Sequence, residues 1–237
     1  MPPLTPELLA LGLVWYLVFL FSTTCHEAAH ALAAKLGGDP TAAYGGQATL
    51  NPLPHIRREP IGMVVIPLLS YLLAQWMMGW ASAPYDPNWQ RRHPHRAGWM
   101  ALAGPGANFA QMFLAGLAIR AGVAAGYFAP PARASFSNVA SLTATGSANF
   151  LTTALSILFV LNLLLGTFNL LPVPPLDGST AVTLLMRERR ALDYLDWLRS
   201  SGFRMLGLLI AMLLFGRIFS FVFGLALNLL YPGAHYA

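Results

Sequence analysis

Long apolar runs alternate with short polar segments along the chain, a pattern typical of proteins that cross a membrane several times. Two of these runs, Leu8–Cys25 and Ala97–Ile119, carry no formal charge over 18 and 23 residues. Phe150–Leu171 is equally free of charge, and Met205–Leu230 contains a single charged residue, Arg217. A helix needs about 20 apolar residues to cross the hydrocarbon core of a bilayer. The pattern therefore predicts four membrane-spanning helices.

Ile61–Trp80 forms a shorter apolar segment, which contains Pro67 and has basic residues on both flanks. Arg57 and Arg58 precede it, and Arg91 is the first of several basic residues that follow it. Lys and Arg concentrate in cytoplasmic connections, so a segment that crosses once does not have two basic flanks. We therefore expect this segment to enter the membrane and return on the same side.

Two polar stretches complete the predicted fold. Residues 37–62 are rich in Gly, Pro and Asn, which excludes a long helix and predicts an extended hairpin. Residues 179–201 mix leucines at helical spacing with arginines, which predicts an amphipathic helix at the membrane interface. The elements together predict an all-α polytopic membrane protein with five to six membrane segments and a small membrane-associated β-hairpin after the first helix. One domain should cover residues 1–237, because nothing in the chain is long enough for a separate soluble domain.

Composition supports a membrane protein and argues against nucleic-acid binding. Of the 237 residues, 56% are apolar and only 10% are charged, well below the usual quarter of a soluble domain. The 14 Lys and Arg exceed the 9 Asp and Glu, but they lie mostly in short segments between apolar runs. We therefore expect the lipid bilayer, and no nucleic acid, as a partner. Cys25 is the single cysteine, for which a packed side chain is a simpler interpretation than a metal ligand.

Two histidines and a glutamate follow the first apolar run directly, in the sequence HEAAH. His26 and His30 are four residues apart, so on a helix their rings emerge from one face and can bind one Zn²⁺. Glu27 lies one residue round the helix, where it can act as general base on an attacking water. The alternative, structural histidines in a packed helix, leaves ionisable groups at membrane depth without compensation. The pattern favours a metal site.

Two imidazoles leave a catalytic zinc ion one protein ligand short, and Asp177 is the candidate for the third. It ends the sequence FNLLPVPPLDG, in which Pro172, Pro174 and Pro175 prevent the preceding helix from continuing. Gly178 then permits a tight turn. In the alternative interpretation Asp177 caps the helix that begins there, and the two roles are compatible.

These motifs resemble those of the site-2 proteases, a family of intramembrane zinc metalloproteases. The resemblance rests on HEAAH, on FNLLPVPPLDG at the end of a later helix and on LAGPGANF (Leu102–Phe109) on the helix between them. In LAGPGANF the small residues favour close helix packing over a catalytic role, with Asn108 as a hydrogen-bonding residue across the contact. Thr49–Gly62 is similar to a stretch of the short bacterial members, so the resemblance spans Phe21–Gly178. It implies a short member without a PDZ or CBS domain, in a bacterial cell membrane.

The resemblance also implies a role for each residue that matches a motif. His26, His30 and Asp177 are expected to hold one Zn²⁺ per chain, and Glu27 is expected to act as general base and acid. Asn169 matches a family asparagine associated with substrate or transition-state contact. A buried asparagine that only ties helix ends together is the alternative for this residue.

The implied function is a zinc endopeptidase that cleaves peptide bonds in or near transmembrane segments of membrane-anchored proteins. A catalytically silent protein that holds a transmembrane helix without cutting it is the alternative, and the intact ligands and Glu27 argue against it. The metal site needs the ends of the first helix and the Phe150–Leu171 helix at one depth, so both should run in the same direction. Basic residues follow both ends, which predicts an active site on the cytoplasmic side. The oligomeric state stays open, a homodimer included.

Overall fold

The computed structural model describes residues 5–200, 202–234 and 236, and nearly all of the regular structure in this part of the chain is helical. Four of its helices are long and apolar enough to cross a membrane. They are the spans expected from the sequence: α1 (Pro6–Leu36), α6 (Pro94–Ala124), α7 (Phe150–Asn169) and α10 (Phe203–Leu230). The predicted all-α polytopic fold is confirmed.

Local sequence signals set the ends of these helices. The side chain of Thr5 accepts a hydrogen bond from the backbone N–H of Leu8 (3.2 Å) at the start of α1, and Gly38 follows its end with a positive φ of 100°. α7 begins at a reciprocal pair, in which Asn149 and Thr152 each accept a hydrogen bond from the other's backbone N–H. These ends leave HEAAH inside α1 and FNLLPVPPLDG across the end of α7.

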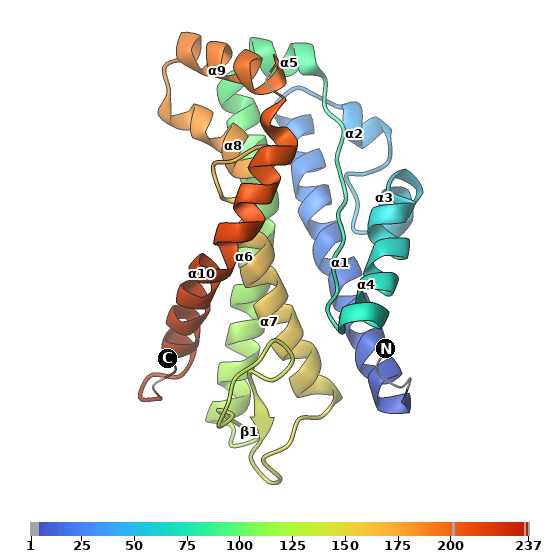
Figure 1. The fold of residues 1–237 in the computed structure, drawn as a ribbon, viewed down its shortest axis with the longest axis vertical. Coiled ribbons are helices and arrows are strands. Elements are labelled where there is room, and N and C mark those ends of the chain that lie inside the picture. Colours follow the sequence, from blue (N-terminus) through green and yellow to red (C-terminus); the bar gives the residue numbers. More distant parts are fainter. Residues whose placement is uncertain (1–4, 201, 235, 237) are drawn as a thin grey trace.

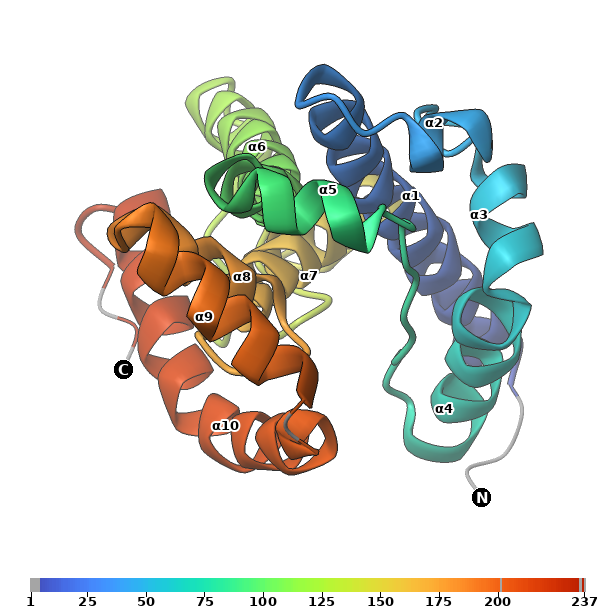
Figure 2. The same cartoon turned by 90° about the horizontal axis from the view of Figure 1, so that it is seen from above.

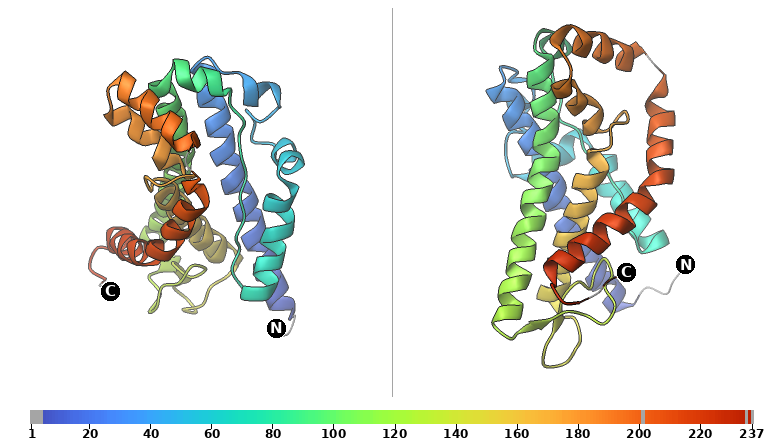
Figure 3. Two further views of the ribbon diagram at one scale, coloured as in Figure 1. Left: turned by 45° about the horizontal axis from the view of Figure 1, so that its top comes forward. Right: turned by 90° about the vertical axis from the view of Figure 1, so that its left-hand side faces the viewer.

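α1, α6 and α7 pack together in the centre of the molecule, with α6 antiparallel to the other two (Figure 1). Their contacts bury Ile119, Ile157 and Val160 completely. Lipid tails are as apolar as these side chains, so close packing rather than removal from water holds such helices together. α1 and α7 run in the same direction, as predicted from the position of the metal motifs. α10 lies at the edge of the bundle, where it packs against α7 (Figure 3).

The predicted β-hairpin after the first helix is wrong. Residues 37–62, all of which the structure describes, contain no strand and form α2 (Thr41–Tyr44), α3 (Pro52–Arg58) and the start of a π-helix, η1 (Ile61–Val65). The physical reason is that Asn and Pro mark helix starts as well as turns: Asn51 accepts a hydrogen bond from the Leu53 N–H, with Pro52 in the first turn. A short antiparallel pair, β1 (Phe128–Ala129) and β2 (Ser141–Leu142), lies between α6 and α7 instead.

The segment after α3 runs along α1 and turns back, which is the path that a re-entrant segment would take (Figure 1). η1 continues into α4 (Ile66–Ala74), which ends at Gln75 in the left-handed region, and an extended stretch then leads back to α5 (Pro87–Arg92; Figure 1). The backbone N–H of Trp80 donates to the Gly62 carbonyl (3.1 Å), so the returning chain lies against the start of the same segment. At about 1.5 Å per residue, Ile61–Ala74 is about 21 Å long, too short for a bilayer core of about 30 Å.

The amphipathic helix predicted over residues 179–201 is broken in two, and Ser201 lies outside the described residues. α8 (Asp177–Ala181) and a 3₁₀ turn, η2 (Val182–Leu185), come first, and α9 (Glu188–Ser200) follows. The break lies at Met186, whose backbone is extended (φ −108°, ψ 153°), and before it the Thr183 hydroxyl donates to the Pro94 carbonyl at the start of α6 (3.2 Å). α9 lies beside α5 in the view of Figure 2, held by an ion pair between Arg91 and Asp196 (2.9 Å).

Candidate active site

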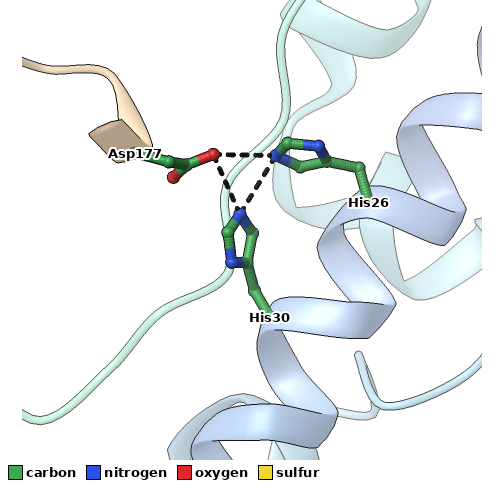
Figure 4. Close-up of side chains that lie close together, drawn as sticks. All are labelled: His26, His30 and Asp177. Atoms are coloured by element: carbon green, nitrogen blue, oxygen red, sulfur yellow. Dashed lines mark hydrogen bonds and ion pairs between the residues drawn. The ribbon is translucent and has the colours of Figure 1, made fainter. Parts of the chain in front are cut away.

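His26 and His30 lie one turn apart on α1, and their rings converge with the carboxylate of Asp177 (Figure 4). The two Nε2 atoms are 3.0 Å apart, and they lie 3.2 Å and 3.3 Å from Oδ2 of Asp177. Among the described residues, these three form the group of metal-ligating side chains that could hold one ion. The structure thus brings together the three ligand candidates of the sequence, although Asp177 lies 147 positions after His30 in the chain.

The end of α7 positions Asp177. α7 stops at Asn169, and a turn in which the Leu176 N–H donates to the Val173 carbonyl (3.0 Å) leads into α8. A Cβ atom on Gly178 would lie 2.2 Å from the Leu170 carbonyl oxygen, so glycine is needed where this turn packs against the helix end. Asp177 is the first residue of α8 rather than its cap, and the cap position makes no side-chain hydrogen bond. The carboxylate is therefore directed to the histidines, and the capping alternative is not seen.

The chemistry of these three residues fits a bound cation. Nδ1 of His30 lies 2.8 Å from the Met100 carbonyl, which can only accept, so Nδ1 carries the proton and Nε2 presents a lone pair. Oδ2 of Asp177 is buried and has no hydrogen-bond donor among the described residues. Acceptor atoms at 3.0–3.3 Å from one another repel unless a positive charge lies between them. Two histidines and a carboxylate are also a ligand set of catalytic zinc sites.

The charge of Asp177 depends on the same cation. Burial opposes ionisation of its carboxyl, and a carboxylate must be ionised to bind a metal ion. With both Nε2 atoms presenting lone pairs, a bound cation is the positive charge that would keep this carboxylate ionised.

The other candidates from the sequence lie outside this group. Glu27 is 5% exposed, follows His26 on α1 and is not part of the His–His–Asp group. Cys25 is half-buried and is not part of the group. Asn169 is the last residue of α7, and its amide donates to the carbonyl of Leu165 on the same helix (3.0 Å). The hydrogen bond of Asn169 does not tie α7 to a neighbouring helix.

Three residues around the histidines were missed as site residues. On α6, the backbone carbonyl of Met100 binds Nδ1 of His30, and the side chain of Asn108 binds Nδ1 of His26. The side chain of Asn162 on α7 then binds that of Asn108. The sequence predicts that Asn108 forms hydrogen bonds across a helix contact, but it does not predict the partners, His26 and Asn162. The sequence signal for Asn162 is an amide inside an uncharged run, which at membrane depth usually has a partner or a function.

Gly104 of α6 lies directly against the two imidazoles. A Cβ atom there would be 2.3 Å from Nε2 of His30 and 2.6 Å from Nε2 of His26. Real Cβ atoms do not approach other atoms so closely, so any larger residue must push the ligand atoms apart. The glycine of LAGPGANF therefore shapes the metal site in addition to allowing close helix packing.

We expect Gly104→Ala to lower zinc affinity at least about tenfold, because the added methyl group occupies the space of the ligand atoms. Gly106→Ala is the matched control, since nothing lies within 4 Å of a Cβ atom at that position. Zinc titration of both purified variants, with melting temperatures of the metal-free forms, tests this. Equal zinc affinity of the two variants would contradict it.

Comparison with known proteins agrees with this geometry. The profile described as peptidase family M50 matches residues 14–214, which include all three members of the His–His–Asp group. The chain belongs to this family. M50 is the site-2 protease family, so the resemblance seen in the sequence is confirmed and the chain is a membrane metalloprotease of this family.

A relative from Bacillus subtilis (strain 168), named "Putative zinc metalloprotease YwhC", is 36% identical over 173 residues. The match covers 71% of this M50 chain and 68% of the relative. No solved structure matches the chain.

Proposed function

We propose that this M50 protein is an intramembrane zinc endopeptidase that hydrolyses peptide bonds in or near transmembrane segments of membrane-anchored proteins. The observation that carries the proposal is the convergence of His26, His30 and Asp177 inside the helical bundle. His26 lies ten residues before the end of α1, which is about 15 Å along the helix. The site is therefore within the length of a membrane-spanning helix rather than beyond its end.

The residues of the site have different roles in the proposed hydrolysis. His26, His30 and Asp177 would hold Zn²⁺, which when bound polarises a carbonyl and makes water more acidic. Glu27 takes the proton from the attacking water and then delivers it to the nitrogen of the leaving amine. His26, Glu27 and His30 are 5–7% exposed, so bulk solvent is largely kept away from the reacting groups.

The basic residues around the site support a membrane orientation as part of this proposal. Lys35 lies at the end of α1, and Arg187, Arg189 and Arg190 follow α8, at the end of the bundle that carries α5 and α9 (Figure 1). Such an excess supports an active site toward the cytoplasmic side of a bacterial cell membrane. Labelling of an Arg190→Cys variant only from outside the cell would contradict this orientation.

The test of the function compares two membrane proteomes, from cells that produce either the wild type or Glu27→Gln. Membrane-anchored proteins that are shortened only with the wild type are candidate substrates, and each is then purified and incubated with the enzyme in detergent. Cleavage within or beside a transmembrane segment supports the proposal. A wild-type protein that binds zinc and holds such a helix without cutting it would instead be the silent binding protein.

Asn169 is proposed as a donor to the carbonyl oxygen as charge develops on it. We expect Asn169→Ala to lower turnover by about 10²–10³, the usual effect of removing one oxyanion donor. Its hydrogen bond in the structure lies within α7, so zinc content and melting temperature should change little. Measuring all three quantities on one preparation tests the role. A variant whose folded fraction cleaves at the normal rate would show that Asn169 has no part in catalysis.

A further inference from the structure

A continuous line of hydrogen bonds joins three helices behind the metal site. Nδ1 of His26 on α1 lies 2.6 Å from Oδ1 of Asn108 on α6, and Nδ2 of Asn108 lies 2.8 Å from Oδ1 of Asn162 on α7. Nδ2 of Asn162 then reaches the carbonyl of Leu158 and the hydroxyl of Ser22, each at 2.9 Å. Asn108, Asn162 and Ser22 are completely buried, so water cannot replace any of these bonds.

The far end of this line fixes the direction of every hydrogen bond in it. The Leu158 carbonyl can only accept, so Asn162 must turn its NH₂ group to Leu158 and its carbonyl oxygen to Asn108. Asn108 must then donate with its own NH₂ group, which leaves its carbonyl oxygen facing Nδ1 of His26. Nδ1 therefore carries the proton of the neutral ring, and Nε2 presents its lone pair toward His30 and Asp177.

Asn108 alone could not fix which of its amide groups, the carbonyl oxygen or the NH₂ group, faces Nδ1 of His26. A side-chain amide has a donor and an acceptor of nearly equal size, and after a half-turn Asn108 would offer NH₂ to Nδ1. His26 would then carry its proton on Nε2 and have no lone pair for a metal ion. The position of the proton on His30 does not depend on an amide orientation, because Nδ1 of His30 donates directly to the backbone carbonyl of Met100.

We propose that Asn162 is a positioning residue for the metal site, which selects the metal-binding tautomer of His26 by fixing the orientation of the Asn108 amide. This inference rests on the proposed function, since it requires a metal ion at Nε2. Asn162 touches neither of the histidines in the described contacts and acts through Asn108. Partners of the second ring nitrogen commonly change metal affinity by about 10–100-fold.

A double-mutant cycle separates this role from simple packing. Asn162→Leu removes the group that holds the Asn108 amide, and zinc affinity should fall by about 10–100-fold. In an Asn108→Ala background, no amide is left for Asn162 to orient, so residue 162 no longer has a route to the His26 ring. In this background, Asn162→Leu should change zinc affinity by no more than about twofold, which is the usual deviation from additivity for substitutions at independent sites.

The measurement is a zinc titration of the purified full chain against a competing chelator, with the melting temperature of each metal-free variant. Ser22→Ala is the matched control, because it removes one buried hydrogen bond of Asn162 while Leu158 still fixes the amide. It should leave zinc affinity within about twofold of the wild type.

The outcomes distinguish this inference from the proposed function. An equal loss of zinc affinity on Asn162→Leu in both backgrounds would overturn the inference, because a packing defect does not depend on residue 108. Unchanged zinc affinity in the single variant would overturn it as well. A wild-type protein that binds no zinc would overturn the proposed function and this inference together.

Discussion

Glu27→Gln protein is expected to bind zinc and fold like the wild type, while its turnover falls by about 10²–10⁴, the usual contribution of a general base. The amide has the shape of the carboxylate but cannot take a proton from the attacking water. Glu27 lies outside the His–His–Asp group, so its replacement leaves the candidate metal ligands in place. Zinc content, melting temperature and cleavage of a purified substrate, measured on one preparation, test this prediction.

The same variant should form a lasting complex with its substrate, because binding is retained when the chemical step fails. His30→Ala serves as the contrasting variant, since it should lose zinc as well as cleavage. Cleavage by Glu27→Gln at a rate near that of the wild type would mean that another group is the base.

The candidate metal site was predictable because each half of it is encoded locally. The spacing of His26 and His30 places both rings on one face of any helix, whatever surrounds it. Three prolines prevent α7 from continuing, whatever surrounds the helix, and Asp177 lies two residues after the last of them. The prediction required in addition only that α1 and α7 run in the same direction, and in the structure they do (Figure 1).

Features that depend on contacts between distant segments were not predictable in this way. Gly104 reads as a small residue for helix packing, and only the position of α6 against α1 shows that it borders the histidines. Asn162 belongs to no motif, and its role appears only when the partners of Asn108 are known. The incorrect hairpin prediction has a local cause, because an Asn–Pro pair such as Asn51–Pro52, which starts α3, also marks turns.

Asp177→Ala is expected to weaken zinc binding by more than about 100-fold and to abolish cleavage, because one of three protein ligands is lost. At a zinc concentration 100 times the wild-type Kd, binding stabilises the folded wild type by about 2.7 kcal/mol. A variant with 100-fold weaker binding gains only about 0.4 kcal/mol under the same conditions.

For a chain of this size, 1 kcal/mol shifts the melting temperature by about 2–4 °C. Zinc should thus raise the melting temperature of the wild type by about 5–11 °C and that of Asp177→Ala by less than about 2 °C. The comparison of each protein with and without zinc cancels any general loss of stability caused by the substitution.

Asp39→Ala is the matched control for the loss of a buried carboxylate away from the site. Asp39 is 2% exposed and accepts hydrogen bonds from the backbone N–H groups of Thr41 (3.0 Å) and Asp86 (2.7 Å). Removal of the Asp39 carboxylate leaves these donors unpaired, which lowers the free energy of unfolding by about 1–3 kcal/mol. The melting temperature measured without zinc should fall accordingly. The rise on adding zinc should nevertheless equal that of the wild type. A full zinc response in Asp177→Ala would remove Asp177 from the ligand set and leave the two histidines in need of another third ligand.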